Sequence, residues 1–179
     1  MQSLELIYRS CVEQDVDPLV NAANGFLAAG TGICGVIFDK AGEDELTEAC
    51  DQIDKPVEDG QAVITPSFGI KNVKAIIHAV GPDFGFTPEA FDKLFDAYYN
   101  SLAVLKENGY HSIAFPLISA GVFGIGLDNP VAVSTEHCVK AYKQFVKDNP
   151  DYELKVILCA YTAHEYESAN PEFEKDYEG

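Results

Sequence analysis

The chain has 179 residues, 47% of them hydrophobic and 23% charged, and this length predicts one compact domain over residues 1–179. Its 29 acidic and 12 basic residues give a formal net charge of −17, with no cluster of Lys and Arg. Because nucleic acids and anionic membranes are bound through clustered positive charge, the composition argues against DNA, RNA and membranes as partners.

The cysteines are odd in number and scattered. All five lie far apart and none forms a CxxC pair. Such a set is neither a disulfide framework nor a zinc site, so we expect reduced thiols in a cytoplasm. No apolar run approaches the roughly 18 residues of a membrane span, and the N-terminus lacks a signal-peptide pattern. We therefore predict a cytoplasmic monomer without a metal or a cofactor.

Apolar runs bounded by Gly, Pro and Asn alternate with segments of helical periodicity along the chain. The first half predicts strands at 4–8, 16–20, 62–65 and 75–80, and a helix over about 33–50 that Gly42 can break. The second half predicts helices at 88–108 and 129–147 and strands at 112–116 and 154–160. From about residue 164 to 179 the chain is a polar, acidic tail, for which we expect a short helix that then frays.

The alternation of strands and helices predicts an α/β layer fold, with helices on both faces of the sheet. Segments such as 75–77 and 156–158 are continuously apolar. Such runs are typical of interior strands that are covered on both sides.

Two of the predicted strands end in loops of small residues that lead into helices. The first loop follows Asn21 and ends in GTGICG at 30–35, and the second spans 118–126. Glycines let the main chain approach a ligand, and consecutive N–H groups near a helix start bind anions. Because ligands of open α/β sheets lie beyond the carboxyl ends of the strands, the two loops could grip a diphosphate from both sides.

The glycines at 30, 32 and 35 also match the dinucleotide-binding pattern GxGxxG, which is weak on its own. The pattern does not directly follow a strand. Asp51 and Asp54 stand near the spacing of a ribose-binding acid, but they precede the next strand instead of ending it. This context does not favour a Rossmann NAD site.

Four motifs, in this order, resemble those of the macro domain (Appr-1″-p processing-like) family. They read VNAAN at 20–24, GTGICG at 30–35, IIHAVGP at 76–82 and SIAFPLISAGVFG at 112–124. The resemblance extends from about Leu4 to Tyr161. It implies a three-layer α/β/α fold with a mixed, mostly parallel central sheet. It also implies that ADP-ribose, free or on a mono-ADP-ribosylated protein, binds in a cleft between the two loops.

The resemblance also implies roles for individual residues. Asn24 would contact the distal ribose and hold a catalytic water, Phe123 would cover the distal ribose, and Tyr161 would stack on adenine. Asn21 has a second interpretation, as a residue that holds the first loop together. The full set of implied contacts is Cys11, Val12, Asn21, Asn24, Gly30, Gly32, Ile33, Cys34, Ser119, Ala120, Gly121, Val122, Phe123, Gly124 and Tyr161.

Two positions depart from the family pattern. Many hydrolytic members carry an Asp that activates water where this chain has Cys34, which leaves Cys34 as pocket lining or as an unusual nucleophile. Its thiol is neutral at the ordinary pKa of about 8.5, although a nearby helix start can lower that value. At Cys11 the family commonly has an Asp that accepts from the adenine amino group. A thiol accepts poorly, so adenine selectivity would need Glu13 or a backbone group.

The resemblance implies two activities. One is a non-catalytic module that recognises ADP-ribose, and the other is hydrolysis of ADP-ribosyl or O-acetyl-ADP-ribose esters. RNA or poly(ADP-ribose) binding is a third hypothesis, against which the net charge of −17 argues. Among residues that mimic catalytic groups, we expect a structural imidazole at His78. We expect Ser119 to bind phosphate, because no GxSxG elbow surrounds it.

Overall fold

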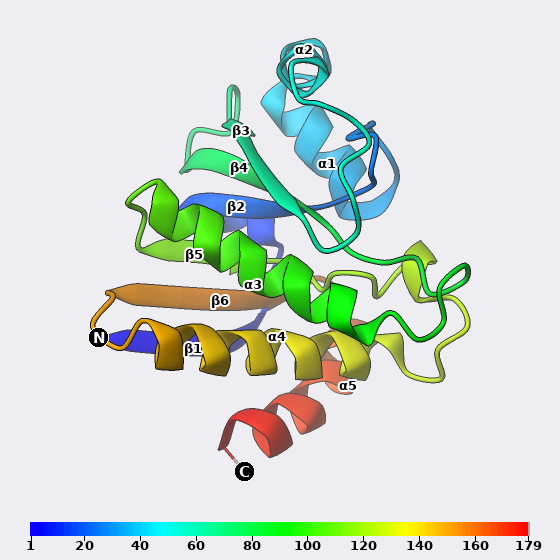
Figure 1. Ribbon diagram of the computed structural model, residues 1–179, viewed down its shortest axis with the longest axis vertical. Coiled ribbons are helices and arrows are strands. Elements are labelled where there is room, and N and C mark those ends of the chain that lie inside the picture. The colour runs from blue at the N-terminus through cyan, green and yellow to red at the C-terminus, as the bar shows by residue number, and fades with distance from the viewer. Residues whose placement is uncertain (179) are drawn as a thin grey trace.

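A single six-stranded sheet forms the centre of the molecule, whose computed structural model describes residues 1–178 (Figure 1). The strands lie in the order β1-β6-β5-β2-β4-β3. All neighbouring pairs are parallel except β3 and β4, which are antiparallel. The strands are β1 (Gln2–Tyr8), β2 (Val16–Ala23), β3 (Ala62–Pro66), β4 (Val73–Val80), β5 (Ser112–Phe115) and β6 (Leu154–Ala160).

Helices cover both faces of this sheet, which confirms the predicted three-layer α/β/α fold with a mixed, mostly parallel sheet. One face packs against α3, α4 and α5, and the other against α1 and α2. The helices are α1 (Gly32–Ala41), α2 (Glu43–Asp51), α3 (Phe91–Glu107), α4 (Pro130–Asp148) and α5 (Ala163–Phe173). Short helical turns lie at η1 (Cys11–Glu13), η2 (Val122–Gly124) and η3 (Glu174–Glu178).

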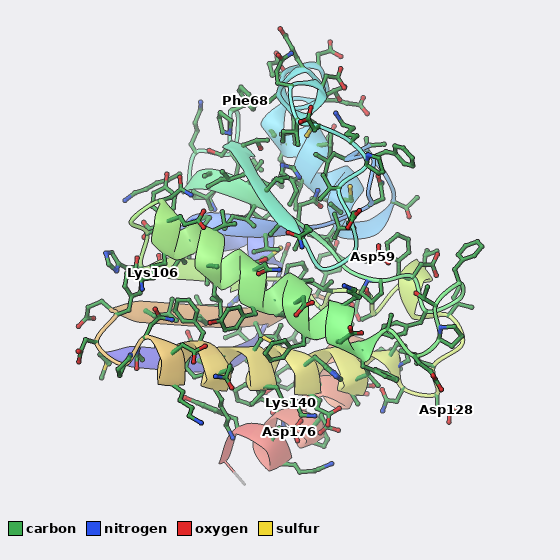
Figure 2. The ribbon with its side chains drawn as sticks, viewed as in Figure 1. Asp59, Phe68, Lys106, Asp128, Lys140 and Asp176 are labelled. Carbon is green, nitrogen blue, oxygen red and sulfur yellow. The ribbon has the colours of Figure 1, made fainter. Side chains whose placement is uncertain are left out.

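The alternation of side chains along the strands divides the core into two apolar layers. In β4, Ile77 faces the layer under α3 and α4, while the neighbouring Ile76 faces the layer under α1. Both are fully buried. Charged side chains such as Lys106 and Lys140 lie on the outside (Figure 2). No helix among residues 1–178 is both long enough and apolar enough to cross a bilayer.

The observed elements differ from the predicted ones mainly at their ends. The predicted helix over 33–50 is two helices, because Gly42 adopts a φ of +105° between them. The tail after Thr162 forms α5, whose Ala169 and Phe173 are buried against the rest of the molecule. Tyr166 of this helix also stacks on Tyr8, with ring centroids 5.8 Å apart. These contacts hold α5 against the body of the molecule, while the last residue of the tail, for which we expect fraying, lies outside the described residues.

Candidate functional site

A cleft of about 400 Å³ is lined by residues at and beyond the carboxyl ends of β2, β5 and β6. This volume falls in the usual range of small-molecule sites. Because β5 stands between β6 and β2 in the sheet, the cleft has two distinct ends. Asn24 after β2 marks one end, and Tyr161 after β6 marks the other. The segment 116–119 that follows β5 lies between them.

Most of the residues predicted to contact a ligand line this one cleft, including members of both glycine-rich loops. They are Cys11, Asn24, Gly30, Gly32, Ile33, Cys34, Ser119, Gly121, Val122, Phe123 and Tyr161. The two loops, far apart in the sequence, are therefore brought to the same site. Ligands of α/β sheets are expected at this edge.

Four residues that were predicted to contact a ligand do not line the cleft, and the structure gives a reason for each. Val12 is buried in the apolar layer under α1, and Asn21 is fully buried. A Cβ on Gly124 would lie 2.6 Å from the Cβ of Pro130, so this glycine serves close packing instead of ligand contact. Ala120 faces a neighbouring hollow at the start of α4.

Sequence reasoning missed several residues that line the cleft. They are Ala22, Ala23, Thr31, Gly81, Pro116, Leu117, Ile118, Cys159 and Glu165. All but two of them lie within or beside the recognised motifs. Cys159 sits inside the last strand. Glu165 comes from the first turn of α5, where no local pattern marks it as part of a site.

The first loop ends at a helix start whose amides have no side-chain cap. Thr31 is the N-cap of α1 but makes no capping hydrogen bond through its side chain. The first N–H groups of a helix have no acceptor within the helix, and they favour a bound anion. Gly32 adopts a φ of +61°, a conformation that favours glycine. Gly32, Ile33 and Cys34, the first three residues of α1, all line the cleft.

The second loop also presents free amides. The N–H groups of Ser119, Ala120 and Gly121 donate to no acceptor within residues 1–178. The hydroxyl of Ser119 donates to the carbonyl of Pro82 at 2.7 Å, so it is engaged in holding the loop. Ser119 is therefore not arranged as a nucleophile, and its amide is the group that remains for a ligand.

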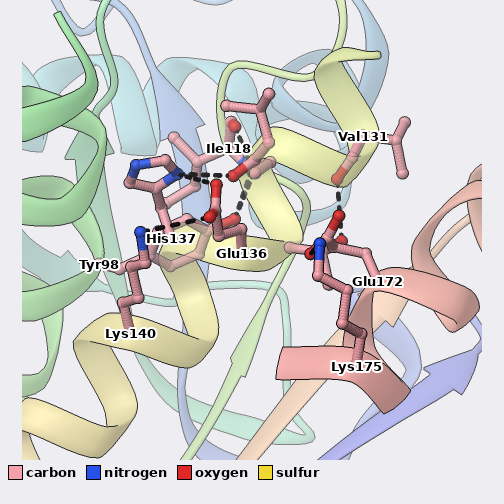
Figure 3. Close-up of polar contacts among 11 residues, drawn as sticks. Tyr98, Ile118, Val131, Glu136, His137, Lys140, Glu172 and Lys175 are labelled. Carbon is pink, nitrogen blue, oxygen red and sulfur yellow. Dashed lines mark hydrogen bonds and ion pairs between the residues drawn. The ribbon is translucent and has the colours of Figure 1, made fainter. Parts of the chain in front are cut away.

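A buried polar cluster fixes the root of the second loop (Figure 3). The hydroxyl of Tyr98 accepts from the amide of Ile118 at 3.0 Å and donates to the Oγ of Ser134 at 2.6 Å. Ser134 in turn donates to the carbonyl of Ile118 at 2.6 Å. Both the N–H and the C=O of Ile118 are thus paired with side chains of α3 and α4.

Electrostatically, the cleft relies on the backbone. Its lining contains no Lys or Arg side chain from residues 1–178, and Glu165 is its only carboxylate. A bound phosphate would therefore be stabilised by main-chain N–H groups, as in anion-binding nests. Within the same residues, no group of three or more His, Cys, Asp or Glu is arranged to hold a metal ion.

The side chain of Asn24 makes most of its hydrogen bonds within its own loop. Its Oδ1 accepts from the amides of Phe26 and Ala28, each at 3.1 Å. Its Nδ2 donates one hydrogen to the carbonyl of Ala28 at 3.0 Å. Because an amide nitrogen carries two hydrogens, one N–H remains. Asn24 can therefore donate to a ribose hydroxyl or to a water, but it cannot take a proton from either.

Cys34 and Cys11 are both neutral thiols at the wall of the cleft. Burial raises the pKa of Cys34, and its Sγ donates to the carbonyl of Ala28 at 3.6 Å. The helix start does not overcome this desolvation, which argues against the nucleophile interpretation. Burial also raises the pKa of Cys11 to about 12, and the charge of Glu165 adds to the effect. Neither thiol can replace the carboxylate found at these positions in the family pattern.

His78 belongs to a buried hydrogen-bond network beneath the cleft. The Nδ2 of Asn21 lies 3.1 Å from its Nδ1, and the Oγ1 of Thr65 lies 2.9 Å from its Nε2. Thr65 also donates to the carbonyl of Pro66, so the Nε2 must carry the proton that Thr65 accepts. Burial lowers the pKa of His78 to about 4. The imidazole is neutral and structural, and Asn21 holds it in place.

Comparison with known proteins identifies a matching family and several relatives of this chain. The macro domain family model matches residues 20–134. The chain is 43% identical over 148 residues to the O-acetyl-ADP-ribose deacetylase of Escherichia fergusonii, covering 80% of each chain. It is 39% identical over 158 residues to the Escherichia coli K12 protein of the same name, covering 85% of this chain and 86% of that one.

Solved structures that resemble this chain are also macrodomains. The Oceanobacillus iheyensis macrodomain with ADP superposes with a TM-score of 0.87 at 28% identity, covering 97% of this chain and 91% of that chain. The Trypanosoma brucei macrodomain in complex with ADP-ribose gives a TM-score of 0.79 at 26% identity, and the match covers 94% of this chain and 68% of that chain. The fold, the ordered motifs and the family match agree, and this chain belongs to the macro domain family.

Proposed function

We propose that this protein binds ADP-ribose or an ADP-ribose derivative in the cleft between its two glycine-rich loops. The observation that carries the proposal is the convergence of unpaired main-chain amides from both loops on one cleft without basic side chains. A diphosphate fits such a site because it accepts several N–H bonds at once. The solved macrodomains with ADP and with ADP-ribose support this choice of ligand.

The two ends of the cleft suit the two ends of this ligand. Tyr161 is 55% exposed and lines the end at β6, where its ring is open to stacking by adenine. Asn24 and Phe123 line the cleft with the two loops and can contact the distal ribose. Calorimetric titration with ADP-ribose, ADP, AMP and NAD tests the proposal. We expect ADP-ribose to bind most tightly, and no binding at millimolar ADP-ribose would refute it.

Replacing Tyr161 with Ala should weaken ADP-ribose binding by roughly 5- to 100-fold, because stacking of a base on an aromatic ring contributes about 1–3 kcal/mol. Phe86→Ala is the control, since Phe86 is also an exposed aromatic residue, at 87%, but does not line the cleft. Titration of both variants measures the difference. Equal losses in the two variants would contradict the assignment of Tyr161 to the adenine.

A second candidate function is hydrolysis of an ester on the distal ribose, such as O-acetyl-ADP-ribose. The relatives named O-acetyl-ADP-ribose deacetylase, at about 40% identity over most of the chain, favour it. Water would attack the ester carbonyl, the bond to the ribose oxygen would break, and acetate and ADP-ribose would form. Since neither Asn24 nor Cys34 can accept the proton of water, a phosphate oxygen of the ligand accepts it in this scheme and passes it to the departing ribose oxygen.

Hydrolysis should depend on the remaining N–H of Asn24. We expect Asn24→Ala to lower kcat for O-acetyl-ADP-ribose by about tenfold or more, the effect of losing one hydrogen bond to a charged or reacting group. The assay follows acetate release at saturating substrate, with ADP-ribose affinity and thermal unfolding measured on the same variant. If the wild-type protein binds ADP-ribose but releases no acetate, the protein is a binding module.

A further inference from the structure

We propose that Glu165 selects adenine, by accepting a hydrogen bond from the exocyclic amino group of the base. The inference rests on the proposed binding of ADP-ribose and names the residue that reads its nucleobase. It assigns the role to α5, a helix that lies beyond the four motifs that identify the family.

Glu165 lies at the end of the cleft where the base would stack. It lines the cleft together with Tyr161, Cys11 and Cys159. Tyr161 offers a ring for the face of the base, and Glu165 offers a carboxylate for its edge.

The carboxylate is held in place by its own helix start. Its Oε1 accepts from the amide of Tyr161 at 2.7 Å, and the amide of Glu165 donates to the Oγ1 of Thr162 at 3.1 Å. The Oε2 makes no hydrogen bond and no ion pair with residues 1–178. One oxygen therefore fixes the orientation of the group, while the other remains free to accept from a ligand.

No other side chain at this end of the cleft is a comparable acceptor. Cys11 and Cys159 are buried thiols whose pKa values are raised by burial, and a neutral thiol accepts weakly. Glu13, the alternative that the sequence suggests, is exposed on η1 and does not line the cleft. The carboxylate that the family pattern would place at Cys11 is thus supplied from a different element.

An ionised carboxylate only accepts hydrogen bonds, so it distinguishes two bases that differ at one position. The amino group of adenine can donate to Glu165. In unsubstituted purine a hydrogen on carbon replaces this amino group, so the base offers no hydrogen-bond donor to Glu165. A site built around a fixed acceptor rejects the ligand that lacks the donor more strongly than an apolar pocket would.

The test compares ADP-ribose with its analogue that carries unsubstituted purine in place of adenine, by calorimetric titration of the full chain. We expect the wild-type protein to bind ADP-ribose roughly 10- to 100-fold more tightly, the range for a hydrogen bond to a charged group. In Glu165→Gln the ratio should fall to about threefold or less, because the amide oxygen still accepts from Tyr161 while the N–H₂ group, which cannot accept a hydrogen bond, faces the base. Glu13→Gln is the control and should keep the wild-type ratio.

Each other outcome overturns the inference. Equal binding of both nucleotides by the wild-type protein refutes base selection, whether or not the variant folds. A wild-type ratio in Glu165→Gln, or a lost ratio in Glu13→Gln, assigns the role to another group. Tight binding of ADP-ribose in any of these cases leaves the proposed function intact, whereas absence of binding to both nucleotides removes the proposed function and this inference together.

Discussion

Replacing Tyr98 with Phe should lower the free energy of unfolding by about 2–3 kcal/mol. The substitution removes the hydroxyl that accepts from the amide of Ile118 and donates to Ser134 (Figure 3). Tyr98 is 1% exposed, so water cannot replace the lost partner, and a buried N–H is left unsatisfied. Chemical denaturation of the wild-type protein and the variant measures the difference.

The neighbouring Tyr99 provides the control for this substitution. Its hydroxyl donates to Asp148 at 2.6 Å, but this contact lies at the surface. Tyr99→Phe should therefore change stability by only about 0.5 kcal/mol. Because Ile118 leads directly into the second loop, Tyr98→Phe should also weaken ADP-ribose binding, whereas Tyr99→Phe should not. Equal stabilities of the two variants would show that the buried cluster does not fix the loop.

Acidification should destabilise the protein through His78, by about 3 kcal/mol once the pH lies below the folded-state pKa. That pKa is lowered by burial from the ordinary 6.5 to about 4, so between these values the unfolded state binds more protons than the folded state. Stability therefore rises with pH across this window. The contribution is fully present above pH 6.5 and is lost as the pH falls through about 4.

A single variant isolates this effect from the titration of the carboxylates. In His78→Gln we expect a lower stability at pH 7 but a smaller loss of stability between pH 7 and 4 than in the wild-type protein, because the side chain no longer titrates. His111→Gln, in which an exposed imidazole is removed, should keep the wild-type slope. Urea unfolding at several pH values gives both slopes. An unchanged slope in His78→Gln would mean that His78 is not held neutral by burial.

The sequence predicts the layers of the fold well because apolar periodicity reports burial directly. The runs around Ile77 and Ile157 give interior strands, and Gly42 breaks the first helix as its lack of a side chain allows. The direction of a strand follows from the length of its connection. Ala62–Pro66 pairs antiparallel to β4 because residues 67–72 are too few for the crossover that parallel neighbours need.

The candidate site, like the fold, could be predicted only in part from the sequence. Loop glycines are visible in the sequence, and the structure brings the loops they mark to one cleft. The sequence motifs do not predict the hydrogen-bond partners and the burial of each side chain. In the sequence Asn21 resembles a ligand contact, but in the structure it hydrogen-bonds to His78. Most of the hydrogen bonds that Asn24 can make are made to Phe26 and Ala28. Glu165 was missed because its position depends on how α5 docks, not on any local motif.

The reliance of the cleft on main-chain amides has an evolutionary consequence. Every residue except proline carries the same N–H, so substitutions at Ala120 or Val122 that preserve the loop conformation leave the pyrophosphate grip unaltered. The end of the cleft that we assign to the nucleobase is lined by side chains, among them Cys11, Tyr161 and Glu165, and has no such buffer. We therefore expect substitutions among these side chains to change which nucleotide is preferred, while the main-chain contacts with the diphosphate persist.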